Sequence, residues 1–190
     1  MNIVIMGKSR CGKSTLANMI CSKVVGYSKM SLDPIVMAFK KSFADLELEY
    51  YKERENKFTT FLESYFDNCT YQDNSSGISY VLEGASLPKE VVLRLKEKEN
   101  TKVIFLGKTK LTAQEFFDEI RKYEKGLSTG GWTKRLDDET LLSWCDDWIR
   151  KSKDYKKFCG ENDIEFIDTS FNQTQVLQSF VERVEKGCDL

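Results

Sequence analysis

The sequence predicts an α/β fold with about five parallel strands in a central sheet and helices on both faces. Short apolar, β-branched runs alternate with amphipathic helical stretches along the 190 residues, which is typical of a parallel sheet. Only two prolines occur, so long helices are allowed. The length suits one sizeable core, and we expect residues 1–190 to form a single domain.

The chain opens with a predicted unit of strand, glycine loop and helix. Residues 2–6 form a continuous apolar run, typical of a strand buried on both faces, and lead into a loop over 7–12. Beyond that loop apolar residues recur four positions apart, which indicates a helix. A weaker strand is expected over 27–31, and Asp33-Pro34 is typical of a helix start.

The rest of the chain continues the alternation. Three more strands are expected, over 78–83, 102–106 and 164–167. Helices are expected in the charged, aromatic region after Pro34 and over 88–99, 112–125, 138–160 and 176–184. Two polar or glycine-rich stretches, 68–77 and 126–134, are predicted to be loops.

Charge and composition exclude several classes of protein. Lys and Arg number 29 against 30 Asp and Glu, a net charge of −1, which argues against a protein built to grip nucleic acid or an anionic membrane. The chain contains no histidine, so Ser-His-Asp and Cys-His catalysis and histidine-liganded zinc sites are excluded. Any general base must be a carboxylate, Lys, Tyr or water.

The six cysteines never form a C-x-x-C pair, and no signal peptide opens the chain. We therefore expect reduced thiols in a cytoplasmic protein. No apolar run approaches the roughly 20 residues of a membrane-spanning helix.

The strongest motif is Gly7-Lys8-Ser9-Arg10-Cys11-Gly12-Lys13-Ser14, which matches the phosphate-binding pattern G-x-x-x-x-G-K-[ST]. Glycines let the backbone wrap around phosphate oxygens, and the following helix directs its positive N-terminus at them. Lys13 can then reach the β- and γ-phosphates, and the Ser14 hydroxyl can ligate Mg²⁺. The alternative is a glycine-rich turn without a ligand. The residues expected to bind the nucleotide are Gly7, Ser9, Arg10, Cys11, Gly12, Lys13, Ser14 and Thr15.

Two carboxylates follow neighbouring predicted strands. Glu83 closes the third strand and can hold Mg²⁺, usually through water, opposite Ser14. Its alternative role is to cap the turn into the next helix. Asp33 follows the second strand, where ligands of open parallel sheets collect, and could accept the proton of an acceptor hydroxyl. Its alternative role is a plain N-cap before Pro34.

A basic segment over 121–135 is predicted to be a lid. It holds five basic residues around a glycine-rich centre and a single acid, Glu124. Such a segment can close on a triphosphate, and Arg121 and Arg135 are the best phosphate contacts because guanidinium binds phosphate bidentately. A solvated surface loop is the alternative. The turn 168–170 after the fifth strand could contact a base or cap the final helix.

These parts, in this order, resemble the nucleoside monophosphate kinase-like group, which includes adenylate, shikimate and dephospho-coenzyme A kinases. The resemblance covers nearly the whole chain and rests on the glycine loop, Asp33, the run Tyr80-Val81-Leu82-Glu83-Gly84, the basic segment and Asp168-Thr169-Ser170. The C-terminal half is more similar to bacterial and phage P-loop kinase-like proteins without an assigned substrate. That likeness lies in 103–107, 120–124, 131–133 and 152–170.

The resemblance implies a three-layer P-loop NTPase fold, a helical acceptor-binding region at about 34–77 and a lid at about 121–135. It also implies Mg²⁺-ATP as donor, with Lys13, Ser14 and the lid arginines in the roles given above. One departure is that 34–77 lacks the glycine-arginine pattern that holds a monophosphate in adenylate kinase-like enzymes. Arg54 and Arg94 are the only arginines between residues 11 and 120.

The sequence therefore predicts transfer of the γ-phosphoryl of ATP to a small molecule, of the nucleoside, nucleotide or coenzyme-precursor class. The alternative is a nucleotide-binding regulatory ATPase with water as acceptor. A GTP switch is disfavoured, because the run Asn56-Lys57-Phe58-Thr59 has Thr where the base-reading aspartate is required. No membrane partner is expected and a nucleic acid partner is disfavoured. The sequence gives no indication of the oligomeric state.

Overall fold

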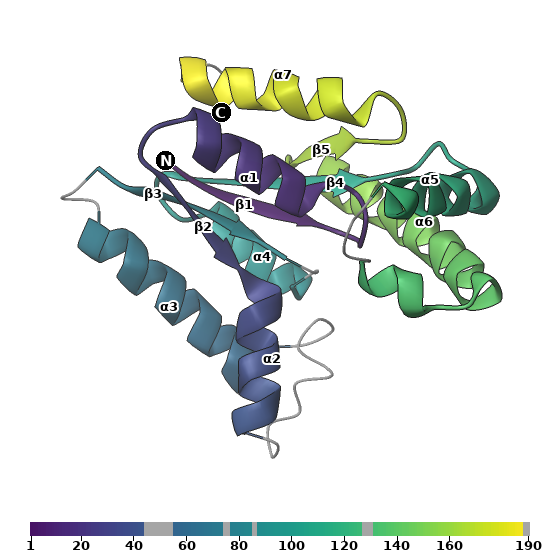
Figure 1. Ribbon diagram of the computed structural model, residues 1–190. Helices are drawn as coiled ribbons and strands as arrows, with labels where there is room; N and C mark the ends of the chain where they lie inside the picture. The colour runs from purple at the N-terminus through teal and green to yellow at the C-terminus, as the bar shows by residue number, and fades with distance from the viewer. Residues whose placement is uncertain (44–54, 74–76, 85–86, 127–130, 188–190) are drawn as a thin grey trace.

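A computed structural model describes residues 1–43, 55–73, 77–84, 87–126 and 131–187 (Figure 1). Its centre is a five-stranded sheet in the order β2-β3-β1-β4-β5, and every pair of neighbours is parallel. The strands are β1 (Asn2–Gly7), β2 (Tyr27–Ser31), β3 (Ser79–Glu83), β4 (Thr101–Gly107) and β5 (Glu165–Asp168). The predicted parallel sheet is confirmed, and its first strand in the sequence is its central strand.

Helices cover both faces of this sheet. They are α1 (Lys13–Lys23), α2 (Leu32–Ser42), α3 (Lys57–Asp73), α4 (Lys89–Lys96), α5 (Ala113–Lys125), α6 (Asp138–Glu161) and α7 (Gln173–Lys186), with a short 3-10 helix at Trp132–Arg135. In Figure 1, α1 and α7 lie over one face, α4 and α6 lie under the other, and α2 and α3 extend below the β2 edge. The three-layer P-loop NTPase arrangement is confirmed.

The alternation of side chains along β1 explains why its residues 3–6 are all apolar. Ile3 and Ile5 join the core under α1 and α7, whereas Val4 and Met6 join the core against α2, α3, α4 and α6. Successive strand residues point to opposite faces, so a strand covered on both faces needs apolar side chains at every position. A third, smaller core between α5 and α6 holds Phe116, Ile120, Leu141, Cys145, Trp148 and Ile149.

Two helix boundaries differ from those that the sequence predicted. Helix α2 begins at Leu32 with Ser31 as its N-cap, so Asp33 is the second helical residue and the predicted N-cap role of Asp33 is wrong. The expected loop from 68 is also wrong for its first part, because α3 continues to Asp73. The Asn68 amide donates to the Ser64 carbonyl one turn earlier, which satisfies this polar side chain within the helix. Residues 44–54 and 74–76 lie outside the described residues.

The expected loop over 126–134 contains the 3-10 helix, and its glycine-rich centre, 127–130, lies outside the described residues. Across the described ranges, no helix has both the length and the apolar character that crossing a bilayer needs. The five cysteines in these ranges are all free thiols, as expected, and Cys188 lies outside them.

The approach of β1 to β4 constrains Gly7. Its φ is +136°, and an added Cβ would overlap the backbone carbonyl oxygen of Leu106. We expect Gly7→Ala to lower the free energy of unfolding by at least about 2 kcal/mol, measured by urea denaturation. Gly160→Ala is the matched control, because a Cβ there meets nothing within 4 Å and its helical site favours alanine by up to about 1 kcal/mol. Equal midpoints for Gly7→Ala and wild type would contradict the close approach.

Candidate functional site

The loop between β1 and α1 has a conformation suited to binding an anion. Gly7, Arg10 and Gly12 have positive φ angles of 136°, 62° and 95°. Helix α1 begins directly after Gly12, and no side chain caps its N-terminus. The first amide N–H groups of α1 therefore remain available to a ligand, and the positive end of the helix dipole reinforces them.

A cavity of about 300 Å³ lies over this loop and gathers most of the predicted site residues. Its floor consists of Ser9, Arg10, Gly12, Lys13, Ser14 and Thr15. Asp33 and Glu83 line it from the side of β2 and β3. The lining is completed by five residues of α5 and the 3-10 helix, Phe116, Glu119, Ile120, Tyr123 and Trp132, and by Gln173, whose amide nitrogen would lie 2.8 Å from a Cβ added to Gly12. Two predicted nucleotide-binding residues, Gly7 and Cys11, do not line the cavity.

Lys13 lies at the junction of the loop and α1. Its ammonium donates to the Lys8 backbone carbonyl at 2.8 Å, so it closes the loop on itself. Burial lowers the pKa of Lys13, and the negative charges of Glu83 and Asp33 oppose that shift. The cation is therefore poorly solvated and close to both carboxylates, a position in which an arriving phosphate oxygen offers it a better partner.

Glu83 joins three elements at the end of β3. Its carboxylate accepts hydrogen bonds from the hydroxyls of Ser14, at 3.0 Å, and Ser31, at 2.7 Å. The ammonium of Lys29 lies 3.3 Å from it. Glu83 is buried, and these three donors fix the orientation of its carboxylate. Sequence reasoning missed Ser31 and Lys29, although their position at the end of the predicted second strand placed them at the same sheet edge.

The Ser14 and Glu83 oxygens fit a magnesium ion. Both are hard oxygen ligands, and the 3.0 Å contact brings a hydroxyl and a carboxylate to one point beside the loop. Within the described residues no cluster of three or more Asp, Glu, Cys or His side chains could hold a metal. Mg²⁺ commonly takes one or two protein ligands and completes its shell with water and substrate phosphates, so a hydroxyl and a carboxylate are a sufficient protein contribution.

Asp33 lines the cavity from the first turn of α2. Among the described residues its carboxylate has no hydrogen bond or ion pair, and it is exposed. An exposed, unengaged carboxylate near Lys13 is available to a ligand that enters from solvent.

The two predicted lid arginines do not line the cavity. Arg121 binds Asp138 at 2.6 Å, Glu124 at 3.0 Å and the Leu136 carbonyl at 2.9 Å, so it ties the end of α5 to the start of α6. Arg135 is exposed at the end of the 3-10 helix. Their catalytic roles stay predictions. Arg94 binds Glu55 and Glu63 away from the cavity, and Arg54 lies outside the described residues.

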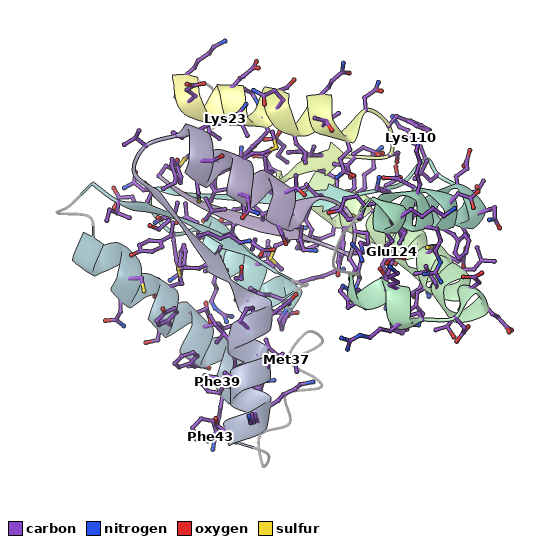
Figure 2. All side chains as sticks on the ribbon, in the orientation of Figure 1. Lys23, Met37, Phe39, Phe43, Lys110 and Glu124 are labelled. Atoms are coloured by element: carbon purple, nitrogen blue, oxygen red, sulfur yellow. The ribbon has the colours of Figure 1, made fainter. Side chains whose placement is uncertain are left out.

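Arg10 is the arginine that reaches the cavity, and Glu124 holds it. One guanidinium nitrogen of Arg10 lies 3.3 Å from the Glu124 carboxylate, and the Thr133 hydroxyl contacts both groups. Glu124 is 3% exposed, and Figure 2 shows it between α5 and the segment that leads to α6. The Arg10 guanidinium also lies 5.8 Å and 5.9 Å from the ring centroids of Tyr123 and Trp132.

Gly131 makes room for this contact, because an added Cβ would lie 2.5 Å from an Arg10 nitrogen. In the sequence, Glu124 differs from its surroundings because it is the single acidic residue among the five basic residues of 121–135. That difference was the available sequence signal for a special role of Glu124.

The turn after β5 is hydrogen-bonded to the loop between β1 and α1 and holds it in place. The Thr169 hydroxyl donates to the Cys11 carbonyl at 3.0 Å, and Lys108 donates to the Thr169 carbonyl at 2.9 Å. The predicted role of 168–170 as a cap of the final helix is wrong, because Asn172 is the N-cap of α7. Asp168 instead accepts hydrogen bonds from Ser170 and Thr109. A base contact by this turn stays a prediction.

Comparison with known proteins identifies the fold. No protein-family model matches the chain, and no curated protein sequence matches it. Among solved structures, shikimate kinase from Bacteroides thetaiotaomicron is similar with a TM-score of 0.56 and 15% sequence identity. The match covers 98% of this chain and 97% of that chain. At this identity the likeness shows a P-loop kinase-like fold and nothing finer.

The contact between Arg10 and Glu124 generates a stability prediction. Glu124→Gln should lower the free energy of unfolding by about 1–3 kcal/mol, because a buried carboxylate that accepts from Arg10, Arg121 and Thr133 is replaced by a neutral amide. Urea denaturation measures the change. Glu185→Gln, at an exposed position of α7, is the control and should stay within about 0.5 kcal/mol of wild type. Equal effects of the two substitutions would contradict the role given to Glu124.

Proposed function

We propose that this protein is an ATP-dependent phosphotransferase that moves the γ-phosphoryl group to a hydroxyl of a small molecule. The acceptor would belong to the nucleoside, nucleotide or coenzyme-precursor class. The observation that carries the proposal is one cavity shared by a phosphate loop, a lysine and serine at its end, and two carboxylates from neighbouring strand ends. The kinase-like fold supports it.

Each residue has a role that its position allows. The loop amides and the N-terminus of α1 bind the phosphates, and Lys13 exchanges the Lys8 carbonyl for a phosphate oxygen. Ser14 and Glu83 would hold Mg²⁺, which neutralises charge on the triphosphate and orients it. Asp33 accepts the proton of the acceptor hydroxyl as that oxygen bonds to the γ-phosphorus, the bond from the γ-phosphorus to the β,γ-bridging oxygen breaks, and ADP leaves. Catalysis then comes mainly from positioning and charge neutralisation.

The segments around the cavity also have roles in the proposed reaction. The chain acts as one domain, with the acceptor entering from the region of about 34–77, to which α2 and α3 belong. The segment over about 121–135 acts as the lid, with Arg121 and Arg135 as phosphate contacts. Arg121 is held by Asp138 and Glu124 in this structure, so its contribution requires those ion pairs to break when the nucleotide binds.

An acceptor screen tests the proposal. ADP formation is measured with Mg²⁺-ATP and purified protein against nucleosides, nucleoside monophosphates, sugars and coenzyme precursors. Stimulation by one class, with the phosphorylated product found by mass spectrometry, is the expected result. Steady ADP formation that no acceptor stimulates would replace the kinase with an ATPase whose acceptor is water.

Lys13→Ala should weaken ATP binding at least tenfold, because a charge-assisted contact to phosphate is lost. Isothermal titration calorimetry measures the dissociation constant. The matched control is Lys23→Ala, at the other end of α1, where Lys23 is bonded to Gln178 on the surface. Unchanged affinity in Lys13→Ala would mean that the loop does not bind the triphosphate through this lysine.

Asp33→Asn should lower the rate of phosphoryl transfer by ~10²–10⁴, the usual effect of losing a positioned general base. ATP affinity should stay within about threefold, because the loop and Lys13 bind the donor independently of Asp33. The measurement is transfer to the stimulating acceptor, alongside ATP titration.

Glu90→Gln is the control for a purely helical role of Asp33. Glu90 is an exposed acid in the first turn of α4, so its loss removes the same favourable charge from a helix N-terminus without touching the cavity. A transfer rate for Asp33→Asn as high as that for Glu90→Gln would exclude Asp33 as the base.

A further inference from the structure

The cavity has two chemically different ends, and the strand order determines which end faces the γ-phosphate. The phosphate loop follows the central strand β1, with β3 and β2 on one side and β4 and β5 on the other. Glu83 is the last residue of β3, Asp33 lies in the first turn of α2 after β2, and Ser14 contacts Glu83. The reacting phosphate and its Mg²⁺ therefore belong at this side. The nucleoside then extends toward the elements that follow β4 and β5, namely α5 and the start of α7.

The side chains at this second end suit a nucleoside. Four apolar or aromatic residues line it: Phe116 and Ile120, which are largely buried in the core between α5 and α6, and Tyr123 and Trp132. Tyr123 and Trp132 are 58% and 50% exposed, so their rings are open to a flat ligand. Two polar side chains, Glu119 and Gln173, line the same end. A planar base with polar edges matches this combination.

Glu119 is held more rigidly than an exposed glutamate ordinarily is. Both of its carboxylate oxygens accept from the Lys108 ammonium, at 2.8 Å and 2.9 Å. The third bond of that ammonium goes to the Thr169 carbonyl at 2.9 Å. All three donors of Lys108 are thereby used. Lys108 is 1% exposed and directly follows β4, so it cannot move to follow Glu119.

The Glu119 carboxylate has acceptor capacity left over for a ligand. Its side chain is 44% exposed and lines the cavity, while its partner Lys108 is buried. A carboxylate offers about four acceptor positions, and Lys108 occupies two of them. The remaining positions are fixed in direction, carry negative charge and accept only from N–H or O–H groups.

We propose that Glu119 is a specificity-determining residue that accepts a hydrogen bond from the nucleoside of the donor nucleotide, and that Lys108 is its positioning residue. The shared chemistry of the ligand group is a neutral donor, either a ribose hydroxyl or the exocyclic amine of adenine. This inference rests on the proposed function, because it requires that the cavity bind ATP. An analogue that lacks the donor leaves the fixed carboxylate without that partner, which is how the site discriminates against it.

The test compares the affinities of wild type and Glu119→Gln for ATP and three analogues, with Mg²⁺, by titration calorimetry. Two analogues, 2′-deoxyATP and 3′-deoxyATP, each lack one ribose hydroxyl, and purine riboside triphosphate lacks the amine. We expect wild type to bind one of these analogues at least about tenfold more weakly than ATP. That ratio should fall below about threefold in Glu119→Gln. The analogue concerned identifies the group that Glu119 contacts.

Glu119→Gln leaves the buried Lys108 without its counter-charge and can therefore destabilise the fold. The double variant Lys108→Met, Glu119→Gln removes both charges together, which is far less disruptive than removing one. It should bind ATP and show the same loss of discrimination. Asp118→Asn is the matched control: its carboxylate neighbours Glu119 on α5 but accepts from Gln114 and does not line the cavity. It should keep the wild-type ratio.

The ratio of affinities separates specificity from structural support, because a supporting residue alters the affinity of every triphosphate alike. Equal binding of ATP and all three analogues by wild type would overturn the role of Glu119. So would a wild-type ratio retained in Glu119→Gln and in the double variant. Absence of binding of all four triphosphates to wild type would overturn the proposed function and this inference together, a result distinct from the other two.

Discussion

Strand β1 is hydrogen-bonded on both edges, and the position of the site follows from that constraint. In a parallel sheet all strands end at the same edge, so a loop after the central strand has neighbours on both sides. β2 and β3 bring Ser31 and Glu83 to one side of the phosphate loop. β4 and β5 bring Lys108 and Thr169 to the other side. A loop after an edge strand would have neighbouring strand ends on one side only. A cavity over that loop would be open to solvent on the other side.

Three charge pairs hold this surrounding structure in place, and each joins different elements. Lys29 of β2 meets Glu83 of β3, Arg10 of the loop meets Glu124 of α5, and the residue after β4, Lys108, meets Glu119 of α5. In each pair at least one member is buried. An isolated buried charge is costly, so each pair favours the one arrangement of elements in which both charges are matched.

The sheet, the loop between β1 and α1 and the position of Glu83 at the end of β3 could be predicted because their signals are local. The loop motif lies within eight residues, and Glu83 ends a short apolar run. The pairing of Lys108 with Glu119 was not predictable, because one residue follows a strand, the other lies on a helix, and neither belongs to a motif. For Arg121, the count of basic residues correctly indicated positive charge. It could not show that Asp138 and Glu124 would neutralise this guanidinium, because that depends on how α5 packs against α6.

The start of α2 was misplaced for a related reason. Asp33-Pro34 is a strong local signal, but Ser31 directs its hydroxyl to Glu83 and α2 begins directly after it. The residue that precedes α2 is thus engaged in a contact with a residue 52 positions away, which no local pattern reveals. Local propensity describes what a segment favours alone, and the tertiary contact decides between nearby starts.

The hydrogen bond from Thr169 to the Cys11 carbonyl joins residues 158 positions apart, and it has a consequence for biosynthesis. The loop between β1 and α1 is synthesised well before Thr169 and before the α7 residues Leu177, Phe180 and Val181, which pack in the same core as α1. A nascent chain halted before β5 would carry the complete motif with an unsupported loop and an uncovered apolar helix. This part of the fold is therefore completed only after α7 has been made, and the growing chain depends on that later segment to bury the apolar surface that α1 exposes.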